Sequence, residues 1–477
     1  FIPFLNICKA NHTAIRIGVN HGSLSDRIMS RYGDTPEGMV ESCMEFLRIC
    51  VAEKFMDVVI SIKASNTVIM VKTVRLLAHI MEKEGMHFPL HLGVTEAGDG
   101  EDGRIKSALG IGALLADGLG DTVRVSLSEA PEAEIPVARK LVDYMTQRRN
   151  HPYIPGAVAP EFHYLSPERR TTTAVHNIGG ENLPVVIAVR LDGNMDFNPQ
   201  FTPDYVYAGR QLPEHPIKGM QYIIDADLWN GQPDTWPAFK SEQLPFVSGF
   251  NASLKFLFIS YMGLDDEAIA CLKYHPEIVL VAQSIHPNRL GEYRALAHQL
   301  MNEGLKNPLV FFQHYAEDEV ENLQIKSAAD MGALIIDGFC DGILLFNQSK
   351  QKGGKKISDK VTDATAFGIL QAGRVRTSKT EYISCPGCGR TLYDLESTIA
   401  RIKQATSHLK GLKIGIMGCI VNGPGEMADA DYGYVGAGRG KISLYKKKEC
   451  IEKNIPEEEA VEKLIELIKK NGDYTER

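Results

Sequence analysis

Two cysteines close together carry the sharpest chemical signal in the sequence. Cys385 and Cys388 flank a Pro-Gly pair in the segment CPGCG. A turn of this length points both sulfurs toward one metal ion or one redox bond. A zinc knuckle and a dithiol redox pair both contain such a motif. A zinc ribbon, however, needs a second cysteine pair, whereas Cys419 stands alone and Cys450 follows it 31 residues later.

A glycine-rich segment after an apolar run supplies a third cysteine and a carboxylate. It reads CIVNGPGE and runs from Cys419 to Glu426. Small residues allow the backbone to approach a bulky inorganic cluster and to donate N–H groups to its sulfides. Three thiolates and one oxygen ligand would leave one iron of such a cluster chemically distinct. The spacing leaves a cluster and a zinc site both open, and Glu426 alone is also typical of a helix cap.

A second group of polar residues lies at the ends of strands predicted within the first 147 residues. The predicted strands cover 15–20, 58–63, 90–96 and 122–128, with the spacing of βα units that feed a parallel sheet. The polar residues in or at the ends of these strands are Arg16, Asn20, Lys63, Glu96, Arg124 and Ser126. A βα barrel assembles its site at the C-terminal strand ends. Four strands make half of a TIM-type barrel, so we expect an open sheet or a barrel whose first strands lie upstream of Phe1.

Three of these strand-end residues are cations that suit a phosphorylated ligand. Arg16, Lys63 and Arg124 come from different strands, and the arginine fork matches phosphate oxygens. Any one of them alone is typical of a surface charge. Asn20 and Ser126 are also typical turn residues, and Glu96 could cap the next helix.

The chain contains an internal repeat. Residues 105–121 match residues 325–341 at 10 of 17 positions with an offset of 220, and residues 75–85 match 294–304 at 6 of 11. The segment between about 148 and 360 is therefore predicted to be a second βα domain of related fold. Its strand ends have lost the cations: Arg124 and Ser126 align with Leu344 and Phe346. We predict that this insert is structural.

A linker and a third domain follow the insert. The lysine-rich stretch 348–360 is predicted to be a solvated linker. Beyond it we predict strands at 381–384, 412–417, 432–435 and 441–445, a helix over 395–409, and an amphipathic helix from Pro456. This pattern indicates a small α+β domain that carries the cysteines.

The composition excludes several classes of function. The net charge is −8, with 44% hydrophobic and 23% charged residues, which disfavours binding to nucleic acid or to an anionic membrane surface. The sequence has no long apolar run and no signal-peptide pattern at its start, so we expect a cytoplasmic protein with a small-molecule partner. The other cysteines are scattered among apolar residues and do not resemble a disulfide framework.

The motifs together resemble those of a known enzyme family. They read CPGCGRT, GCIVNGPGE, RIGVNHGSLS, SIKAS, GVTEAG and IKSALGIGALLADGLGDTVRVSL. In this combination they resemble the 4-hydroxy-3-methylbut-2-enyl diphosphate synthases of the non-mevalonate isoprenoid pathway. The resemblance covers residues 15 to about 145 and 381 to about 445, and the insert is similar to that of the long, three-domain form found in plants and some bacteria.

The resemblance implies an activity and a set of site residues. It implies an oxidoreductase that opens the ring of 2-C-methyl-D-erythritol 2,4-cyclodiphosphate with two electrons from ferredoxin or flavodoxin and loss of water. The implied ligands of a [4Fe-4S] cluster are Cys385, Cys388, Cys419 and Glu426. The implied substrate contacts are Arg16, Asn20, Lys63, Arg124 and Ser126, and Glu96 is the implied proton donor. A plant member would reside in the plastid stroma.

The expected architecture is α/β with three parts. Residues 1–147 are expected to form the C-terminal part of a substrate-binding TIM-type barrel, 148–360 a barrel-like structural insert, and 361–477 the iron–sulfur domain. The family barrel begins further upstream, with two more arginines that contact the diphosphate. The alternative is a barrel protein with a zinc ribbon and a binding or non-redox lyase role.

Overall fold

The computed structural model describes residues 1–98, 100–348, 357–387, 389–391, 393–421 and 423–476. The chain divides into two compact units, which are considered separately. The first consists of residues 1–143 and 377–477, and the second of residues 144–376. The sequence placed these boundaries near 147 and 360. The second boundary differs because helix α10 (Asp359–Ala372) packs on strands of the second unit.

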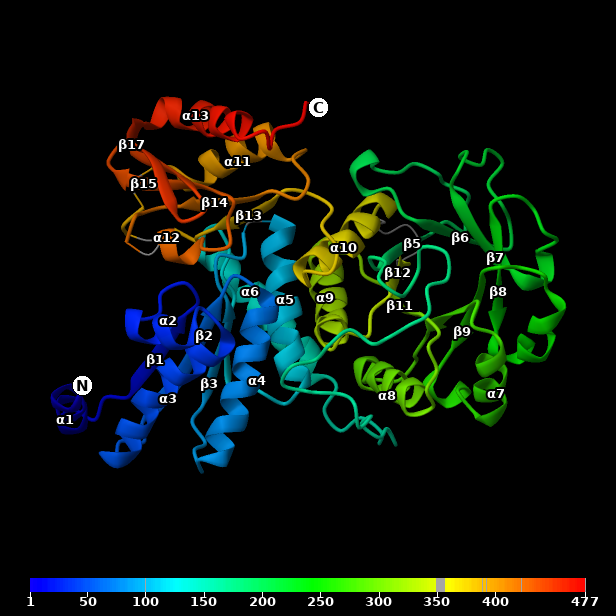
Figure 1. Ribbon diagram of the computed structural model, residues 1–477, viewed down its shortest axis with the longest axis horizontal. Helices are drawn as coiled ribbons and strands as arrows, with labels where there is room; N and C mark the ends of the chain where they lie inside the picture. Colours follow the sequence, from blue (N-terminus) through cyan, green and yellow to red (C-terminus); the bar gives the residue numbers. More distant parts are fainter. Residues whose placement is uncertain (99, 349–356, 388, 392, 422, 477) are drawn as a thin grey trace. The chain divides into compact units, whose positions relative to one another are not determined.

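The first unit contains a parallel four-stranded sheet in the order β1-β2-β3-β4 (Figure 1). Its strands are β1 (Ile15–Asn20), β2 (Val58–Ala64), β3 (Leu90–Val94) and β4 (Thr122–Arg124). Its helices are α1 (Ile2–Ala10), α2 (Asp26–Tyr32), α3 (Pro36–Ala52), α4 (Thr67–Lys83), α5 (Gly100–Ala116) and α6 (Glu134–Thr146). All four strands were predicted, but β3 and β4 end before Glu96 and Ser126, which therefore lie on the loops that follow.

Two helices next to this sheet begin at residues whose side chains cap them. Asn66 caps α4, because its side-chain oxygen accepts hydrogen bonds from the backbone N–H groups of Val68 and Ile69. Thr35 caps α3 in the same way through Gly38. Only two residues separate helix α4 from β2, and the turn that follows Lys63 is therefore short and defined.

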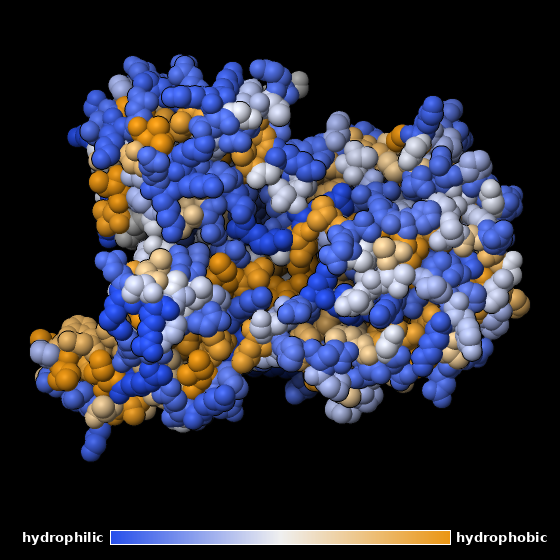
Figure 2. Space-filling view, in the orientation of Figure 1, coloured by the Kyte–Doolittle hydropathy of each residue, from blue (hydrophilic) through white to orange (hydrophobic). Residues whose placement is uncertain are grey.

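Apolar side chains gather on the surface of α1 and the neighbouring part of α3 (Figure 2). Phe1 packs edge-on against Phe46 with ring centroids 5.0 Å apart. Ile7 remains 62% exposed and Phe4 52% exposed. Helix α1 therefore buries Leu5 and Cys8 and leaves Phe4 and Ile7 largely exposed to solvent.

The first unit also contains a five-stranded sheet in the order β13-β14-β15-β16-β17. Its strands are β13 (Glu381–Ser384), β14 (Lys413–Met417), β15 (Tyr432–Gly438), β16 (Lys441–Lys446) and β17 (Glu449–Pro456). Its helices are α11 (Leu395–Thr406), α12 (Gly423–Glu426) and α13 (Glu457–Lys470). The first three strands run parallel and the last two antiparallel. Strand β17 and the short helix α12 were not predicted, whereas the other elements lie close to their expected positions.

The second unit is a closed barrel of eight parallel strands (Figure 1). The strands are β5 (Val185–Val189), β6 (Tyr205–Gly209), β7 (Gln221–Asp225), β8 (Thr235–Lys240), β9 (Lys255–Ile259), β10 (Ile278–Ala282), β11 (Leu309–Tyr315) and β12 (Gly342–Asn347). The helices are α7 (Asp266–Tyr274), α8 (Arg289–Asn302), α9 (Val320–Ile336) and α10. Pairing of β12 with β5 closes the ring. The predicted barrel-like insert is confirmed as a complete barrel.

The internal repeat includes buried polar contacts as well as apolar residues. Arg75 Nε donates to Asp117 at 2.8 Å in the first unit, and Arg294 Nε donates to Asp337 at 2.9 Å in the second. The N–H groups of Leu90 and Leu309 donate to the carboxylates of Asp121 and Asp341, respectively, at 2.8 and 2.9 Å. The two units thus stabilise the turns before β4 and β12 with the same residue types, an arginine–aspartate pair and a second aspartate.

The predicted linker lies mostly outside the described residues, because 349–356 are not described. On its far side Ser358 caps α10, accepting a hydrogen bond from the N–H of Val361. The last residues of the predicted linker therefore belong to a helix. No helix in the described part of the chain is long and apolar enough to span a membrane.

Candidate functional site

A cavity of about 260 Å³ lies in the first unit, between the ends of the four-stranded sheet and the loops after β13 and β14. It brings together seven of the residues singled out from the sequence: Asn20, Lys63, Glu96, Arg124, Cys385, Cys419 and Glu426. These residues are separated by up to about 400 positions in the chain. The strand-end cations and the cysteine segments therefore share one site.

Lys63 and Arg124 form the cationic side of the cavity. Lys63 is half-buried, and its burial, followed by the charges of Arg124 and Arg16, lowers the pKa of its ammonium group. Such clustering of cations with few counter-charges is unfavourable in the empty site and is relieved when an anion binds. The site is therefore electrostatically suited to a phosphorylated molecule.

Two glycines make room for these cations on the sheet. A Cβ atom on Gly93 would lie 3.2 Å from the carbonyl oxygen of Arg124, and one on Gly18 would lie 3.8 Å from Cε of Lys63. Gly93 pairs with both Lys63 and Arg124 in the strand register. Small residues on the central strands thus leave space for the long side chains of the two cations.

Glu96 lies on the loop after β3 in a left-handed conformation, with φ +50°. Its side chain is buried, with only 6% of the residue exposed. Burial, followed by the charge of Glu426, raises the pKa of Glu96 to about 8. A hydrogen bond joins the two carboxyl groups, and burial raises the pKa of Glu426 as well. The pair is therefore arranged to hold a proton between its carboxyl groups at neutral pH.

The opposite wall of the cavity contains sulfur. Cys385 follows β13, Cys419 follows β14, and Glu426 ends the short helix α12. The N–H of Gly418 donates to Cys385 Sγ at 3.2 Å, and burial raises the pKa of this thiol. Cys388, the remaining predicted ligand, lies outside the described residues.

The chemistry of this wall fits a sulfur-ligated metal group. The backbone N–H of Gly418 already points at a sulfur atom, as a second-shell donor to a cluster would. The cavity is also lined by residues with small or no side chains: Pro386, Gly387, Gly418 and Gly423. The described residues by themselves contain no set of three or more His, Cys, Asp or Glu side chains placed to hold a metal ion. A complete ligand set would thus need the undescribed Cys388.

Arg16 and Ser126 do not line the cavity. Arg16 lies on β1 with its side chain exposed, although its charge still affects the pKa values of Lys63 and His91. Ser126 is 1% exposed, and its hydroxyl group has no hydrogen-bond partner among the described residues. Asn20, Lys63 and Arg124 are therefore the predicted substrate contacts that the fold brings to the cavity.

Sequence reasoning missed two residues of this region. Arg390 lines the cavity and lies five residues after Cys385, inside the motif CPGCGRT. As the cation that follows the cysteine pair, it could have been singled out for an anionic ligand. His91 lies near Arg16, Arg124 and Lys63; burial, followed by these three charges, lowers the pKa of its imidazole. Nothing in the sequence around His91 indicated that this residue lies near the site.

Polar contacts within the first unit hold the two walls together. Ser128 Oγ lies 2.7 Å from Ser384 Oγ, and Ala97 forms an isolated parallel bridge with Ser384. Lys106 Nζ donates to Glu381 Oε1 at 3.0 Å, and both side chains are at most 7% exposed. These bonds position the start of the Cys385 loop directly beside the Glu96 loop.

Comparisons with known proteins agree with this geometry. A family model described as the GcpE TIM-barrel domain matches residues 1–139, and one described as the GcpE protein C-terminal domain matches residues 381–470. The chain is 78% identical over its full length to the 4-hydroxy-3-methylbut-2-en-1-yl diphosphate synthase (flavodoxin) of Bacteroides fragilis, of which it covers 75%. It is 79% identical over 98% of its length to the same-named protein of Bacteroides thetaiotaomicron, covering 76%.

A more distant relative carries the same name. The 4-hydroxy-3-methylbut-2-en-1-yl diphosphate synthase (flavodoxin) of Porphyromonas gingivalis is 48% identical over the whole chain, which covers 76% of that relative. The chain thus spans about three quarters of the length of these relatives. Its insert is matched together with both flanking segments. The chain belongs to the GcpE family, the family of the 4-hydroxy-3-methylbut-2-en-1-yl diphosphate synthases (flavodoxin).

Proposed function

We propose that the protein reduces 2-C-methyl-D-erythritol 2,4-cyclodiphosphate to 4-hydroxy-3-methylbut-2-enyl diphosphate in isoprenoid precursor biosynthesis, with flavodoxin as electron donor. The names of the relatives state this product and flavodoxin. The single observation that supports it most is the cavity in which Lys63 and Arg124 face Cys385, Cys419 and Glu426. Cations suited to an anion and sulfur atoms suited to a metal group thus line the same small cavity.

The reaction needs two electrons and one proton. One carbon–oxygen bond of the cyclic diphosphate breaks, which leaves an anionic diphosphate on the product. A second carbon–oxygen bond breaks as the hydroxyl group takes the proton and leaves as water, and a double bond forms between the two carbons. Lys63 and Arg124, with Asn20 beside them, would bind the diphosphate, because forked and ammonium donors suit its oxygens. Arg16 would add to the positive electrostatic potential of the sheet at the diphosphate. Ser126 would contribute its hydroxyl group from a position behind the residues that line the cavity.

Glu96 is the proposed proton donor to the departing hydroxyl group. It is buried at the cavity and held at φ +50° by the loop after β3, so its carboxyl group has little freedom to turn away. Proton transfer requires this kind of fixed approach within hydrogen-bonding distance of the leaving oxygen.

A [4Fe-4S] cluster would be held by Cys385, Cys388, Cys419 and Glu426. When bound, such a cluster supplies electrons one at a time at a potential set by its surroundings. Glu426 offers an oxygen where the cysteines offer sulfur, and an oxygen ligand is exchanged more readily. The hydrogen bond from Gly418 to the sulfur of Cys385 would tune the same group.

The decisive test is the metal and sulfide content of protein purified without oxygen. About four irons and four acid-labile sulfides per chain are expected for one such cluster. Zinc without sulfide would instead support a zinc-ribbon binding module or a non-redox lyase and would overturn the proposal. Glu426→Gln should change the cluster's electron paramagnetic resonance spectrum, whereas Glu449→Gln on the exposed strand β17 should leave it unchanged.

The second barrel is proposed to act as a structural insert that sets the reach of the cysteine-bearing domain. Support comes from its strand ends, where the cations of the first unit are replaced by neutral residues. Replacing the whole second unit, residues 144–376, by a flexible linker should then lower turnover while retaining the metal content. Full turnover of the shortened protein would count against this role.

A further inference from the structure

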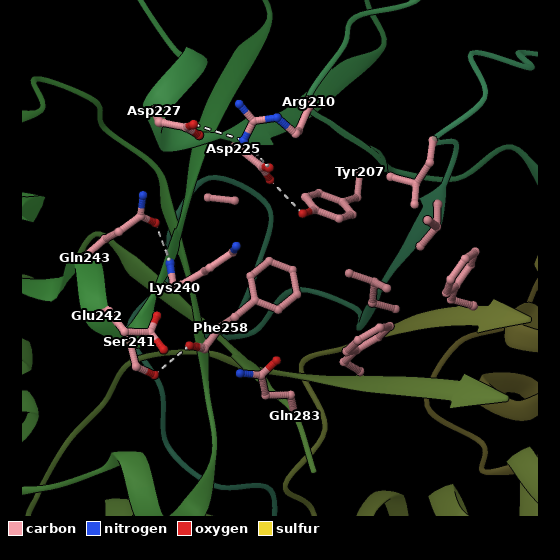
Figure 3. Close-up of a pocket in the computed structure, with 16 residues that line it drawn as sticks. Tyr207, Arg210, Asp225, Asp227, Lys240, Ser241, Glu242, Gln243, Phe258 and Gln283 are labelled. Atoms are coloured by element: carbon pink, nitrogen blue, oxygen red, sulfur yellow. Dashed lines mark hydrogen bonds and ion pairs between the residues drawn. The ribbon is translucent and has the colours of Figure 1, made fainter. Parts of the chain in front are cut away.

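A cavity of about 340 Å³ opens at the carboxyl-terminal strand ends of the second barrel (Figure 3). Its lining comes from all eight strands or the residues that follow them, including Val189, Tyr207, Asp225, Phe258, Phe312 and Phe346. This end of a βα barrel is where ligands and substrates bind. The volume is within the range of small-molecule sites, roughly 300–1,000 Å³.

The cavity occupies the place that corresponds to the candidate site of the first unit. Leu90 and Leu309 hold equivalent positions in the repeat, because the backbone N–H of each donates to the aspartate of the repeated turn. Leu90 pairs with Ile60 on the preceding strand, and Leu309 pairs with Leu280. Counting along the strands from there, Lys63 corresponds to Gln283, and Arg124 corresponds to Leu344. Both counterparts line the cavity of the second barrel.

The same register shows that aromatic rings replace the small residues of the first unit. Gly18 corresponds to Phe258 and Gly93 to Phe312. The rings of Phe258 and Phe312 lie edge-to-face with centroids 6.1 Å apart, and Tyr207 lies 5.4 Å from Phe258. The position therefore keeps a cavity but exchanges an anion-binding wall for an aromatic one, which favours a ligand with an apolar body.

The rim of the cavity carries charges of both signs. Arg210 Nη1 lies 3.0 Å from Asp227 and 3.8 Å from Asp225, so this guanidinium group is neutralised. The hydroxyl group of Tyr207 donates to Asp225 at 2.7 Å. These contacts cluster on one side of the cavity (Figure 3). A multiply charged anion such as a diphosphate is disfavoured there, because two aspartates stand beside the arginine.

Lys240 is different, since none of the described carboxylates pairs with its ammonium group. It ends β8, and its side chain points toward the middle of the cavity, in the direction of Phe258 and Tyr207 (Figure 3). Glu242 and Gln283 line the cavity nearby, and neither side chain has a hydrogen-bond partner among the described residues. The aromatic wall is thus bordered by one unpaired cation, one unpaired carboxylate and one unpaired amide.

We propose that this cavity binds an α-amino acid with a large apolar side chain. The side chain packs against Phe258, Phe312 and Phe346, the carboxylate pairs with Lys240, and the ammonium group is held by the carboxylates of the rim. A zwitterion satisfies groups of both charges at once, which neither a simple carboxylic acid nor an amine does. This binding site goes beyond the reductive chemistry of the first unit.

The test is equilibrium binding of L-phenylalanine to the full chain, by calorimetry or ligand-observed NMR. L-Phenylalanine should bind at least ten-fold more tightly than phenethylamine, which lacks the carboxylate, and than 3-phenylpropionate, which lacks the ammonium group. Inorganic diphosphate should not compete with it. Absence of L-phenylalanine binding at millimolar concentration, or tighter binding of diphosphate, would overturn the proposal.

Variants locate the site within the barrel. Lys240→Gln should weaken L-phenylalanine binding about ten-fold, the amount expected when one charge-assisted hydrogen bond is lost. Lys273→Gln is the matched control, because Lys273 lies on the last turn of α7 and is absent from the cavity lining. Phe258→Leu should also weaken binding. Equal affinities in Lys240→Gln and Lys273→Gln would show that the ligand binds elsewhere.

Discussion

Gly22 and Gly425 approach so closely that a Cβ atom on Gly22 would lie 2.1 Å from the carbonyl oxygen of Gly425. Gly22 follows β1 with φ +82°, and Gly425 belongs to α12, next to Glu426. The turn after the first strand therefore supports the backbone that carries the proposed carboxylate ligand. Only a residue without a side chain permits this contact.

Gly22→Ala should disturb the α12 turn and the chemistry of Glu426. We expect at least a ten-fold loss of turnover and a changed cluster spectrum, because the Gly425 backbone must move. Gly118→Ala is the control: Gly118 also has φ +77°, but a Cβ atom there meets nothing within 4 Å. That variant should lose about 1 kcal/mol of stability from backbone strain alone, with turnover intact. Equal effects of the two variants would attribute the loss to strain.

Lys63→Met should weaken substrate use and leave the fold intact. Loss of one charged hydrogen bond to the diphosphate, about 2–3 kcal/mol, corresponds to a fall in kcat/KM of roughly 30- to 150-fold. Removal of a half-buried ammonium group beside Arg124 also relieves repulsion, so the melting temperature should not fall. Lys83→Met, on the exposed end of α4, should change neither quantity. Unaltered kcat/KM in Lys63→Met would remove this residue from the substrate site.

The repeated ion pairs should differ in their contributions to stability. Arg75 and Asp117 have side chains that are 0% and 2% exposed, whereas Arg294 is 20% exposed beside Asp337. Asp117→Ala leaves a guanidinium group buried and should cost about 3–5 kcal/mol. Asp337→Ala should cost clearly less, because Arg294 can reach water. Hydrogen exchange measured separately in α4 and α8 would reveal the difference, and equal protection losses would contradict it.

His298 should make the stability of the second barrel depend on pH. Burial lowers the pKa of its imidazole, whose Nδ1 accepts a hydrogen bond from the N–H of Ala159 at 3.3 Å. Phe162 and Phe339 pack against the ring, and the charged groups that act on it are Asp337, Arg294 and Glu161. The unfolded chain therefore binds the proton more tightly. The stabilisation is present above pH 6.5, the ordinary pKa, and is lost as the pH falls below it.

His298→Asn keeps an acceptor for Ala159 and cannot titrate. Its unfolding free energy should therefore fall less than that of the unaltered protein between pH 7 and pH 5, as measured by urea unfolding of the second barrel. His215→Asn, in an exposed loop, should follow the unaltered protein. Parallel pH curves for all three proteins would exclude His298 as the source.

Strand β1 could be predicted because its buried and exposed residues alternate, whereas all four residues of β13 are buried. Ile15–Asn20 and Glu381–Ser384 were predicted at their observed bounds. Strand β17 was missed because Glu449–Pro456 reads ECIEKNIP and exposes most of its residues, so it has no apolar stripe. Between residues 185 and 255 the strands are joined by 3-10 turns and short loops without α-helices, so no helical periodicity marked the βα rhythm there.

The candidate site was predictable where a residue type reveals its chemistry. Cys385, Cys419 and the cations Lys63 and Arg124 were singled out by type and spacing, and the fold brings them together. Arg390 was missed because the cysteines of its motif dominated the interpretation. The cavity of the second barrel could not be foreseen, since loss of the cations at Gln283 and Leu344 suggests loss of a site until the register is known.

Closure of the second barrel through its first and last strands has a consequence for how such a chain could arise. Because β12 pairs with β5, the ring of strands begins and ends at one seam. Arg376, the last residue of the unit, donates to the carbonyl oxygen of Pro184, the residue just before β5. A barrel whose first and last strands are adjacent can be inserted into a loop of another protein without changing the path of the host chain. A duplicated copy could be inserted into its own parent domain in the same way.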